Sequence, residues 1–502
     1  MKSILEVLET TVKNYPTKIA FVQKDREIDY QTFLDISKKI GTSLTSLNER
    51  NKPIIIFIDK TINALASMFG VLYSGNFYTM VDVNMPADRI DMILKTLEPI
   101  AIVTDNKNLE KAKGISNNVP VLIHEELVDT KIDEDKLANV YEKLIDTDPM
   151  YVLFTSGSTG VPKGSVISHK ALLAYSDWFT KTFDINENTI FGSQTPFYFS
   201  MSISDIFGTI RSGATFHIIP KMLFSFPVKL LEYLNESKIN TIYWVPSALA
   251  IVANLKALDV VLPTTLENIL FAGEVMPTKQ LNIWRKHLPN VKYANLFGPT
   301  ETTDICTYYV VNREFDDVET LPIGAHCDNC DVFIVKDDGS EALDGEEGEL
   351  YARGSFVGLG YYNNPEKTNA AFVQNPLNKA YPELVYKTGD IVKYNELGEL
   401  IYLSRRDFQI KHMGYRIELG EIEMNINALD GITTCACIYV DDKIILYFVS
   451  NELKEEDVIT YAKDKLLAYM VPNVVNKITK MPHNANGKID RVELKKMYEG
   501  DK

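Results

Sequence analysis

The segment Tyr151–Lys170 reads YVLFTSGSTGVPKGSVISHK, an apolar strand followed at once by hydroxyl and glycine residues. Gly157, Gly160 and Gly164 permit positive φ and a close approach of the backbone to a ligand. Successive amides of such a loop form a concavity that binds anions, and Lys163 adds a positive charge. The spacing differs from that of a Walker A loop. The segment therefore predicts a phosphate-binding loop of another kind, directly after a strand.

Length and composition indicate a globular protein of more than one domain. The chain has 502 residues, of which 45% are hydrophobic and 24% charged. The net charge of −16 disfavours nucleic acid or an anionic membrane as the main partner, since both repel an acidic surface. The N-terminal stretch 1–16 is typical of a helix and not of a signal peptide. Because no apolar run is long enough to cross a bilayer, we expect a cytoplasmic protein without a membrane span.

The five cysteines are expected to be reduced thiols in the core. Cys327 and Cys330 have C-x-x-C spacing, but a tetrahedral zinc site needs a second pair. Cys435 and Cys437 have C-x-C spacing inside an apolar, strand-like segment, which is less typical of such a site.

Strand-like runs alternate with helical patterns before residue 400. The apolar run 52–58 is followed by Ile62, Leu65, Phe69 and Leu72 at helical spacing. This alternation predicts an α/β fold, with mixed or parallel sheets flanked by helices.

The pattern changes from Gly345 onwards. Short strands separated by Gly and Asp turns predict a β-rich subdomain, and a smaller α+β region is expected to follow it. We therefore predict a large N-terminal domain over residues 1–406 and a small C-terminal α+β domain over residues 407–502. The tail, residues 481–500, has the polar composition of a loop.

Six motifs follow one another along nearly the whole chain. They are LFTSGSTGVPKG (153–164), NLFGPTETT (295–303), GELYARG (348–354), YKTGD (386–390), SRRDFQIKHMGYRIELGEIE (404–423) and NGKID (486–490). By this ordered and very specific set the chain resembles the adenylate-forming (AMP-binding, ANL) superfamily. That superfamily includes nonribosomal peptide synthetase adenylation domains, acyl- and aryl-CoA synthetases and beetle luciferases. Within it, the chain is most similar to the stand-alone D-alanine–carrier-protein ligases.

The resemblance implies an acid–thiol ligase that uses ATP and Mg²⁺. A small carboxylic acid would displace pyrophosphate from ATP, and the acyl-adenylate would then pass its acyl group to the phosphopantetheine thiol of an acyl or peptidyl carrier protein in trans. Such displacement is mostly positioning and neutralisation of charge. The phosphates would be held by the loop residues Thr155, Ser156, Gly157, Ser158, Thr159, Gly160 and Lys163.

The other nucleotide contacts are implied in the same way. Glu301 would ligate Mg²⁺, a hard cation that prefers oxygen, and Thr300 would contact the α-phosphate. Phe297 offers a ring on which adenine stacks, and Asn295 an amide for its edge. The resemblance further makes Asp390 the acceptor for both ribose hydroxyls, and Arg405 a contact to ribose or phosphate.

A mobile C-terminal domain is also implied. Lys488 would neutralise charge between the acid and the α-phosphate during adenylation. The small domain would then rotate about Asp407, and Gly414 would leave room for the phosphopantetheine arm.

The expected acid pocket departs from the family pattern. By position it comprises Ser200, Met201, Ser204, Tyr243, Leu270, Ala272, Gly273, Leu296, Asp304 and Ile305. Amino-acid-activating members carry an aspartate for the α-ammonium where this chain has Ser200, and the D-alanine ligases usually carry a cysteine where it has Ala272. An ordinary α-amino acid should therefore bind poorly.

Asp304 is a carboxylate where pocket-lining residues usually are apolar, and two interpretations stay open. It binds an amine or hydroxyl away from the α-carbon, as in a β-amino or hydroxyaryl acid, or it points elsewhere and is satisfied by backbone donors. The alternative functions are a D-alanine ligase with an altered pocket, an acyl- or aryl-CoA ligase, and a non-catalytic relative that binds nucleotide or acid.

Overall fold

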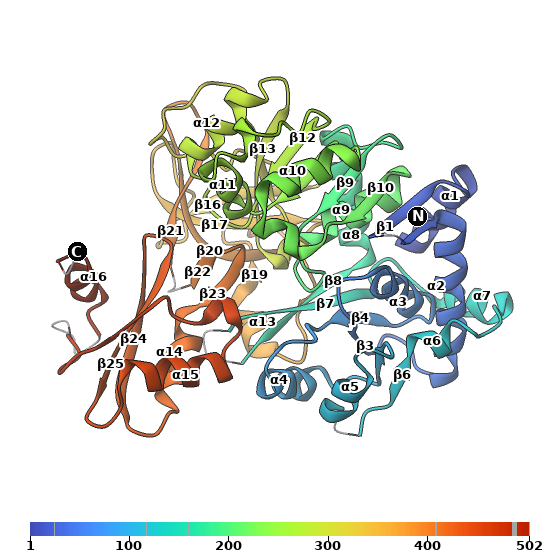
Figure 1. Cartoon of the computed structure of the whole chain (residues 1–502), viewed down its shortest axis with the longest axis horizontal. Helices are drawn as coiled ribbons and strands as arrows, with labels where there is room; N and C mark the ends of the chain where they lie inside the picture. The colour runs from blue at the N-terminus through green and yellow to red at the C-terminus, as the bar shows by residue number, and fades with distance from the viewer. Residues whose placement is uncertain (25, 117, 158–160, 407–408, 484–488, 501–502) are drawn as a thin grey trace. The chain divides into compact units, whose positions relative to one another are not determined.

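The structure is a computed structural model that describes residues 1–24, 26–116, 118–157, 161–406, 409–483 and 489–500 (Figure 1). The chain divides into two compact units. The first comprises Met1–Val83, Thr96–Leu153 and Gly164–Ser404, and the second comprises Asn84–Lys95, Phe154–Lys163 and Arg405–Lys502. The domain boundary that the sequence predicts, between residues 406 and 407, remains a prediction.

A nine-stranded sheet runs through the first unit in the order β15–β14–β13–β12–β11–β9–β10–β1–β2. Its strands are β1 (Ile19–Gln23), β2 (Arg26–Asp29), β9 (Ile190–Ser193), β10 (Thr215–Ile218), β11 (Thr241–Trp244), β12 (Asn268–Phe271), β13 (Lys292–Phe297), β14 (Thr307–Val310) and β15 (Ala325–His326). The strands from β13 to β1 pair in parallel, and β2, β14 and β15 are antiparallel. β11 and β12 are buried throughout, as the apolar runs predict for covered parallel strands.

A seven-stranded sheet has the order β18–β8–β7–β4–β3–β5–β6. Its strands are β3 (Pro53–Phe57), β4 (Phe77–Met80), β5 (Ala101–Thr104), β6 (Val121–Ile123), β7 (Pro149–Thr155), β8 (Lys163–Ser168) and β18 (Gly360–Tyr361). The phosphate-loop segment therefore lies between two strands, β7 and β8, and the strand expected before it is confirmed.

Helices cover the nine-stranded and seven-stranded sheets of the first unit; Figure 1 shows α10, α11 and α12 alongside the nine-stranded sheet. The helices are α1 (Ile4–Asn14), α2 (Tyr30–Leu44), α3 (Ile62–Tyr73), α5 (Leu109–Ile115), α6 (His124–Leu127), α7 (Glu134–Lys143), α8 (His169–Thr182), α9 (Ser202–Ser212), α10 (Pro227–Glu236), α11 (Pro246–Asn254), α12 (Thr278–His287) and α13 (Pro365–Ala371). The helix expected at 62–72 is α3. It begins at an N-cap, Thr61, whose hydroxyl accepts from Ala64 N, and it ends before Gly75 at φ +77°.

The β-rich subdomain is a five-stranded sheet in the order β16–β17–β20–β19, with β21 paired to β20. Its strands are β16 (Cys330–Val335), β17 (Gly348–Gly354), β19 (Phe372–Gln374), β20 (Leu384–Tyr394) and β21 (Leu400–Arg405).

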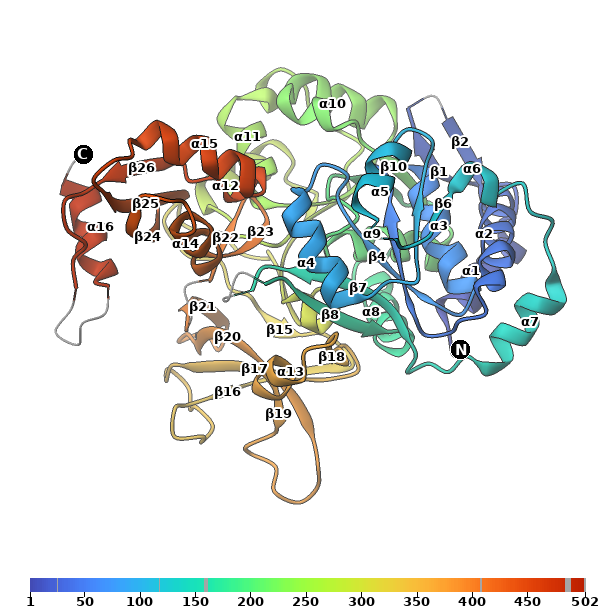
Figure 2. The same cartoon turned by 90° about the horizontal axis from the view of Figure 1, so that it is seen from below.

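The second unit has a three-stranded sheet with apolar side chains on both faces. Its strands β24 (Ile432–Val440), β25 (Lys443–Ser450) and β26 (Val474–Lys477) lie beside α14 (Leu419–Asn427) and α15 (Glu455–Lys465) (Figure 2). Cys435 and Cys437 pack with these two helices, and Ala436 and Ile438 pack with α16 (Arg491–Gly500) on the other face. The unit also contains β22 (Gln409–His412), β23 (Tyr415–Glu418) and most of α4 (Ala87–Leu97).

The prediction that the tail is a loop is wrong for its last part, which forms α16. Asp490 caps this helix, since its Oδ1 accepts from Glu493 N at 3.0 Å. Leu494 is fully buried against the three-stranded sheet. A single buried leucine among charged residues is too weak a pattern to reveal the helix in the sequence.

All five cysteines are buried free thiols, as expected. In the part of the chain that the structure describes, no helix is both long and apolar enough to cross a membrane.

Candidate active site

The turn after β13 has an unusual backbone. The short 3₁₀ helix Thr300–Thr302 ends at Thr303, which has φ +71° and ψ −58°. Asp304 N donates to Thr302 O at 2.8 Å, so residues 302–304 form a γ-turn of the rarer, positive-φ kind. A β-branched residue is strained in this region. The conformation is held by Thr303 Oγ1, which donates to Phe356 O at 2.9 Å.

Gly298 lets the two sides of this turn approach closely. A Cβ at Gly298 would lie 2.5 Å from Ile305 Cα and 2.6 Å from Asp304 O, which is closer than atoms pack. The sequence NLFGPTETTD therefore folds back on the end of β13, and this places Glu301 and Asp304 on one tight loop.

Glu301 is a fully buried carboxylate held by a tyrosine from another sheet. Tyr361 OH, on β18, donates to Glu301 Oε1 at 2.7 Å, and Gly358 N donates to the Glu301 backbone oxygen at 2.8 Å. A fixed carboxylate oxygen is the ligand type that Mg²⁺ prefers. The chemistry of Glu301 therefore fits the predicted metal ligand, and Tyr361 is a supporting residue that the motifs did not indicate.

Asp390 projects from an irregularity in the β-rich sheet. Glu349 pairs with Ile391, yet Tyr351, two residues on, pairs with Lys387, so the segment 388–390 bulges out of the ladder. Gly389 adopts φ +77° in this bulge, and its N donates to Glu349 Oε1 at 3.1 Å. The TGD motif thus forms a bulge in β20, and Asp390 is part of this bulge.

The predicted adenine residues occupy the end of β13. The ring of Phe297 lies 5.8 Å from the ring of Tyr402 on β21, measured between centroids. Tyr402 is a second aromatic side chain that the motifs did not single out. Asn295 Nδ2 donates to Pro322 O at 2.8 Å, so its Oδ1 is the atom left for a nucleotide edge.

The described part of the phosphate loop belongs to the second unit. Thr155 Oγ1 is buried and has no hydrogen-bond partner among the described residues, which fits an oxygen-rich ligand there. Ser156 Oγ, in contrast, donates to Arg416 O at 2.6 Å and accepts from Glu418 N at 3.2 Å, so β23 already uses this hydroxyl. Lys163 begins β8.

The remaining predicted residues of this unit are only partly described. Arg405 is the half-buried last residue of β21, and Gly414 takes φ +80° in the turn between β22 and β23. The predicted residues Ser158, Thr159, Gly160, Asp407 and Lys488 lie outside the described residues.

Asp304 is the centre of a buried hydroxyl network in the first unit. Its Oδ2 accepts from Ser204 Oγ at 2.9 Å and from the hydroxyls of Tyr175 and Tyr243 at 3.1 Å each. These donors come from α9, α8 and β11. Burial raises the pKa of Asp304 to about 6, although the hydroxyls, including that of Ser200, oppose this shift. The donors are side chains, and not the backbone groups considered above.

Tyr175 is a member of this network that the motifs did not reveal. It lies on α8, which packs against α9, and its hydroxyl contacts Ser204 Oγ at 2.6 Å as well as Asp304. Its helical spacing in the sequence is that of an ordinary core residue, so no local signal could have indicated its role.

The other predicted pocket positions are also in the core of the first unit. Ser200 is half-buried, and its Oγ accepts from Thr300 Oγ1 at 3.3 Å. Gly273 takes φ +90°. The buried apolar positions are Met201, Leu270, Ala272, Leu296 and Ile305. The structure thus brings Ser200, Ser204, Tyr243 and Asp304 together, while the apolar positions are equally typical of a core.

Comparison with known proteins shows the family to which the chain belongs. A family model described as AMP-binding enzyme matches residues 8–362. The chain is 30% identical to an L-proline--[L-prolyl-carrier protein] ligase of Pseudomonas fluorescens, covering 100% of both proteins. It is 30% identical to a D-alanine--D-alanyl carrier protein ligase of Bacillus cytotoxicus, covering 98% of both. It is 31% identical to tyrocidine synthase 1 of Brevibacillus parabrevis over 98% of this chain, which spans 45% of that relative.

A solved structure shows the same fold. The Vibrio cholerae adenylation domain AlmE, in complex with glycyl-adenosine-5'-phosphate, superposes with a TM-score of 0.84 at 20% identity. The match covers 99% of this chain and 98% of that chain.

The fold and the site together define an adenylate-forming ligase, a class of enzyme that uses ATP and Mg²⁺. The chain belongs to the AMP-binding enzyme family, and its relatives include carrier-protein ligases and a nonribosomal peptide synthetase.

Proposed function

We propose that this enzyme activates a small carboxylic acid as acyl-AMP and then transfers the acyl group to the phosphopantetheine thiol of a carrier protein. The observation that carries the proposal is the end-to-end match with two stand-alone ligases whose names specify a carrier protein as acceptor. A cytoplasmic location follows from this role as part of the proposal.

The first unit supplies groups suited to the adenylation step. Asp390 would accept hydrogen bonds from ribose, and the rings of Phe297 and Tyr402 would contact adenine. Glu301, fixed by Tyr361, would hold Mg²⁺, which neutralises phosphate charge when it is bound. Thr300 would contact the α-phosphate beside the incoming carboxylate. The family resemblance gives the other phosphates to the phosphate loop, whose described part, with Thr155, belongs to the second unit.

We further propose that the acid is not an ordinary α-amino acid. The position that pairs with the α-ammonium in amino-acid-activating relatives is Ser200, which offers no negative charge. Losing one partner of a buried ion pair typically costs about 3–5 kcal/mol. The expected pocket carries a carboxylate at Asp304 instead, and this position favours a β-amino or an aryl acid as the substrate.

ATP–pyrophosphate exchange over a panel of acids tests this proposal. The panel comprises L- and D-alanine, β-alanine, hydroxybenzoates and short fatty acids, and we expect exchange with a non-α-amino acid. Acyl transfer is then compared between a phosphopantetheinylated carrier protein and free coenzyme A. D-Alanine as best substrate would contradict the interpretation of Ser200, and coenzyme A as better acceptor would make the enzyme a CoA ligase.

A further inference from the structure

Asp304 has one saturated carboxylate oxygen and one that is still available. Oδ2 accepts three hydroxyl hydrogen bonds, from Tyr175, Ser204 and Tyr243. Oδ1 makes no hydrogen bond with the described residues, and it is not among the buried polar atoms that lack a partner. Asp304 as a whole is only 2% exposed, so any group that reaches Oδ1 would be enclosed by the core. The Ser200 hydroxyl also lies close enough to favour the charged form of Asp304.

A buried lysine and a buried aspartate lie close enough to this network for the aspartate, Asp205, to influence Tyr243. Lys60 Nζ, in the loop after β3, donates to Ser193 O and to Ser193 Oγ at 3.0 Å each. Its opposite charge is Asp205, the neighbour of Ser204 on α9. Burial lowers the pKa of Lys60 and raises the pKa of Asp205, while their mutual attraction opposes both shifts. Whether both groups are charged or both are neutral, the pair has no net charge.

Asp304 is therefore a carboxylate without a counter-charge among the described residues of this region. Among the described residues it forms no ion pair, and its three donors are neutral hydroxyls. A buried, unpaired carboxylate is costly, and a protein that retains one ordinarily supplies a partner of opposite charge. None of the described residues supplies one at Oδ1, and a bound ligand would.

The position of Asp304 sets how far that charge lies from the acid's carboxylate. Ser200, at the family's α-ammonium position, is 3.3 Å from Thr300, which would contact the α-phosphate. Asp304 instead turns toward α8 and β11, because the γ-turn at Thr303 directs it there. An amine bound by Asp304 would therefore lie among residues of α8, α9 and β11, and not at the position that holds an α-ammonium in the family.

We infer that the acid carries a cationic amino group at its β-carbon or beyond, and that Oδ1 of Asp304 binds it. This inference rests on the proposed function and narrows its substrate class. The inference excludes hydroxyaryl acids, because a hydroxyl brings no positive charge. It also excludes acids whose only amine is aromatic, because such an amine is neutral near pH 7.

Matched acids that differ in one group test the inference. ATP–pyrophosphate exchange is measured for β-alanine against 3-hydroxypropionate, 4-aminobutyrate against 4-hydroxybutyrate, and 3-(aminomethyl)benzoate against 3-(hydroxymethyl)benzoate. In at least one pair we expect kcat/KM to favour the amino acid by about 100-fold or more. The variant Asp304→Asn should abolish that preference, with its fold checked by thermal unfolding.

Two further variants separate charge from structure. Tyr175→Phe keeps the carboxylate and removes one donor, so it should keep the preference for the amino acid. Asp177→Asn makes the same charge change on the exposed side of α8 and should match the wild type. Equal or better use of the hydroxy acids by the wild type would overturn the inference and leave adenylation intact, whereas exchange with no acid would contradict the proposed function and the inference together.

Discussion

Burial of the Asp304 carboxylate lowers the free energy of unfolding by an amount that depends on pH. Around it lie Tyr151, Tyr175, Tyr243 and Cys327, and burial raises the pKa of each of these, so all four are neutral near pH 7. The pKa of Asp304 itself is raised from 3.8 to about 6. Between these values the folded state binds more protons than the unfolded state, so stability falls as the pH rises from about 4 to 6.

The variant Asp304→Asn should remove this cost. Asparagine keeps an oxygen acceptor for the three hydroxyls but has no charge to desolvate. We expect it to be more stable than the wild type by about 2–3 kcal/mol at pH 7.5, with most of the gain lost at pH 4.5. Urea unfolding at the two pH values measures the difference. A gain that is the same at both would show that burial of the charge is not its cause.

Gly298 is the residue that permits the turn beside Asp304. The variant Gly298→Ala would bring a Cβ to 2.5 Å from Ile305 Cα, a backbone atom that cannot rotate away. We expect a loss of roughly 2–3 kcal/mol in the free energy of unfolding, with loss of pyrophosphate exchange. Gly114→Ala is the matched control, because a Cβ there meets nothing within 4 Å inside α5 and should change stability by less than about 1 kcal/mol. Equal effects of the two changes would contradict the packing argument.

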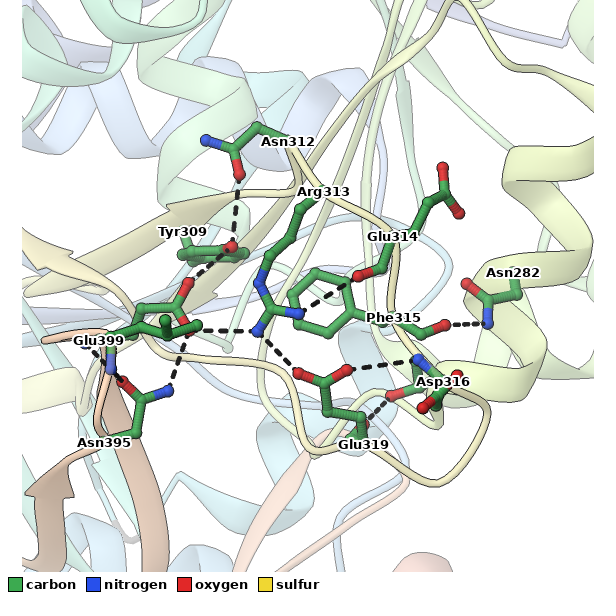
Figure 3. Close-up of polar contacts among 12 residues, drawn as sticks. Asn282, Tyr309, Asn312, Arg313, Glu314, Phe315, Asp316, Glu319, Asn395 and Glu399 are labelled. Atoms are coloured by element: carbon green, nitrogen blue, oxygen red, sulfur yellow. Dashed lines mark hydrogen bonds and ion pairs between the residues drawn. The ribbon is translucent and has the colours of Figure 1, made fainter.

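At the scale of elements, a polar cluster attaches β21 to the loop after β14, as Figure 3 shows. Arg313 pairs with Glu319 at 2.7 Å and with Glu399 at 3.2 Å, and its guanidinium lies 3.7 Å from the ring centre of Phe315. Tyr309 OH also donates to Glu399, at 2.9 Å. Because Glu399 immediately precedes β21, the cluster helps to hold Tyr402 beside Phe297.

The variant Arg313→Ala should loosen this attachment. The side chain is 30% exposed, so solvent screening limits the loss to about 1–2 kcal/mol in urea unfolding. We also expect KM for ATP to rise more than kcat falls, because Tyr402 would contact adenine. Lys181→Ala breaks an exposed i,i+4 pair on α8 and should cost less than about 0.5 kcal/mol. An unchanged KM for ATP would argue against a role for β21 in holding the nucleotide.

The contribution of this cluster to stability depends on pH with the opposite sign to that of Asp304. Arg313 hydrogen bonds lower the pKa of Glu319, and Asn395 and Arg313 lower the pKa of Glu399 against the effect of burial. Their contribution is present above the ordinary glutamate pKa and is lost as the pH falls through the lowered values.

Elements were predictable where the pattern is repeated and local. The apolar spacing of Ile62, Leu65 and Phe69 predicts α3, and the run 52–58 predicts β3. In both cases the apolar character of each position indicates directly that the position is buried. The helix α16 was missed because its stability depends on one contact, Leu494 on the three-stranded sheet, which no local pattern shows.

For the whole molecule, the motifs predicted the family and supplied the candidate nucleotide-binding residues, but they did not indicate the residues that support these candidates. Tyr361 and Tyr402 come from strands far along the chain, and each reads locally as an ordinary β residue. Tyr175 on α8 reaches Asp304, and Lys60 after β3 lies opposite Asp205 on α9, only because these elements pack in one core. Such groups are defined by tertiary neighbours, and a sequence without its fold does not reveal them.

A lysine in the tail provides the last test, at the scale of the two half-reactions. Lys488 lies outside the described residues, and its role in adenylation alone is a proposal from the family resemblance. If that role holds, Lys488→Ala should lower ATP–pyrophosphate exchange by about 100-fold or more, since one charge at the transition state is worth several kcal/mol. Transfer from supplied acyl-adenylate to the carrier thiol should fall less than threefold. Lys480→Ala, which changes an exposed lysine directly before the tail, should change neither step. Equal loss of both steps in Lys488→Ala would mean that one arrangement of the enzyme serves both reactions, and the proposal of a rotating C-terminal domain would fail.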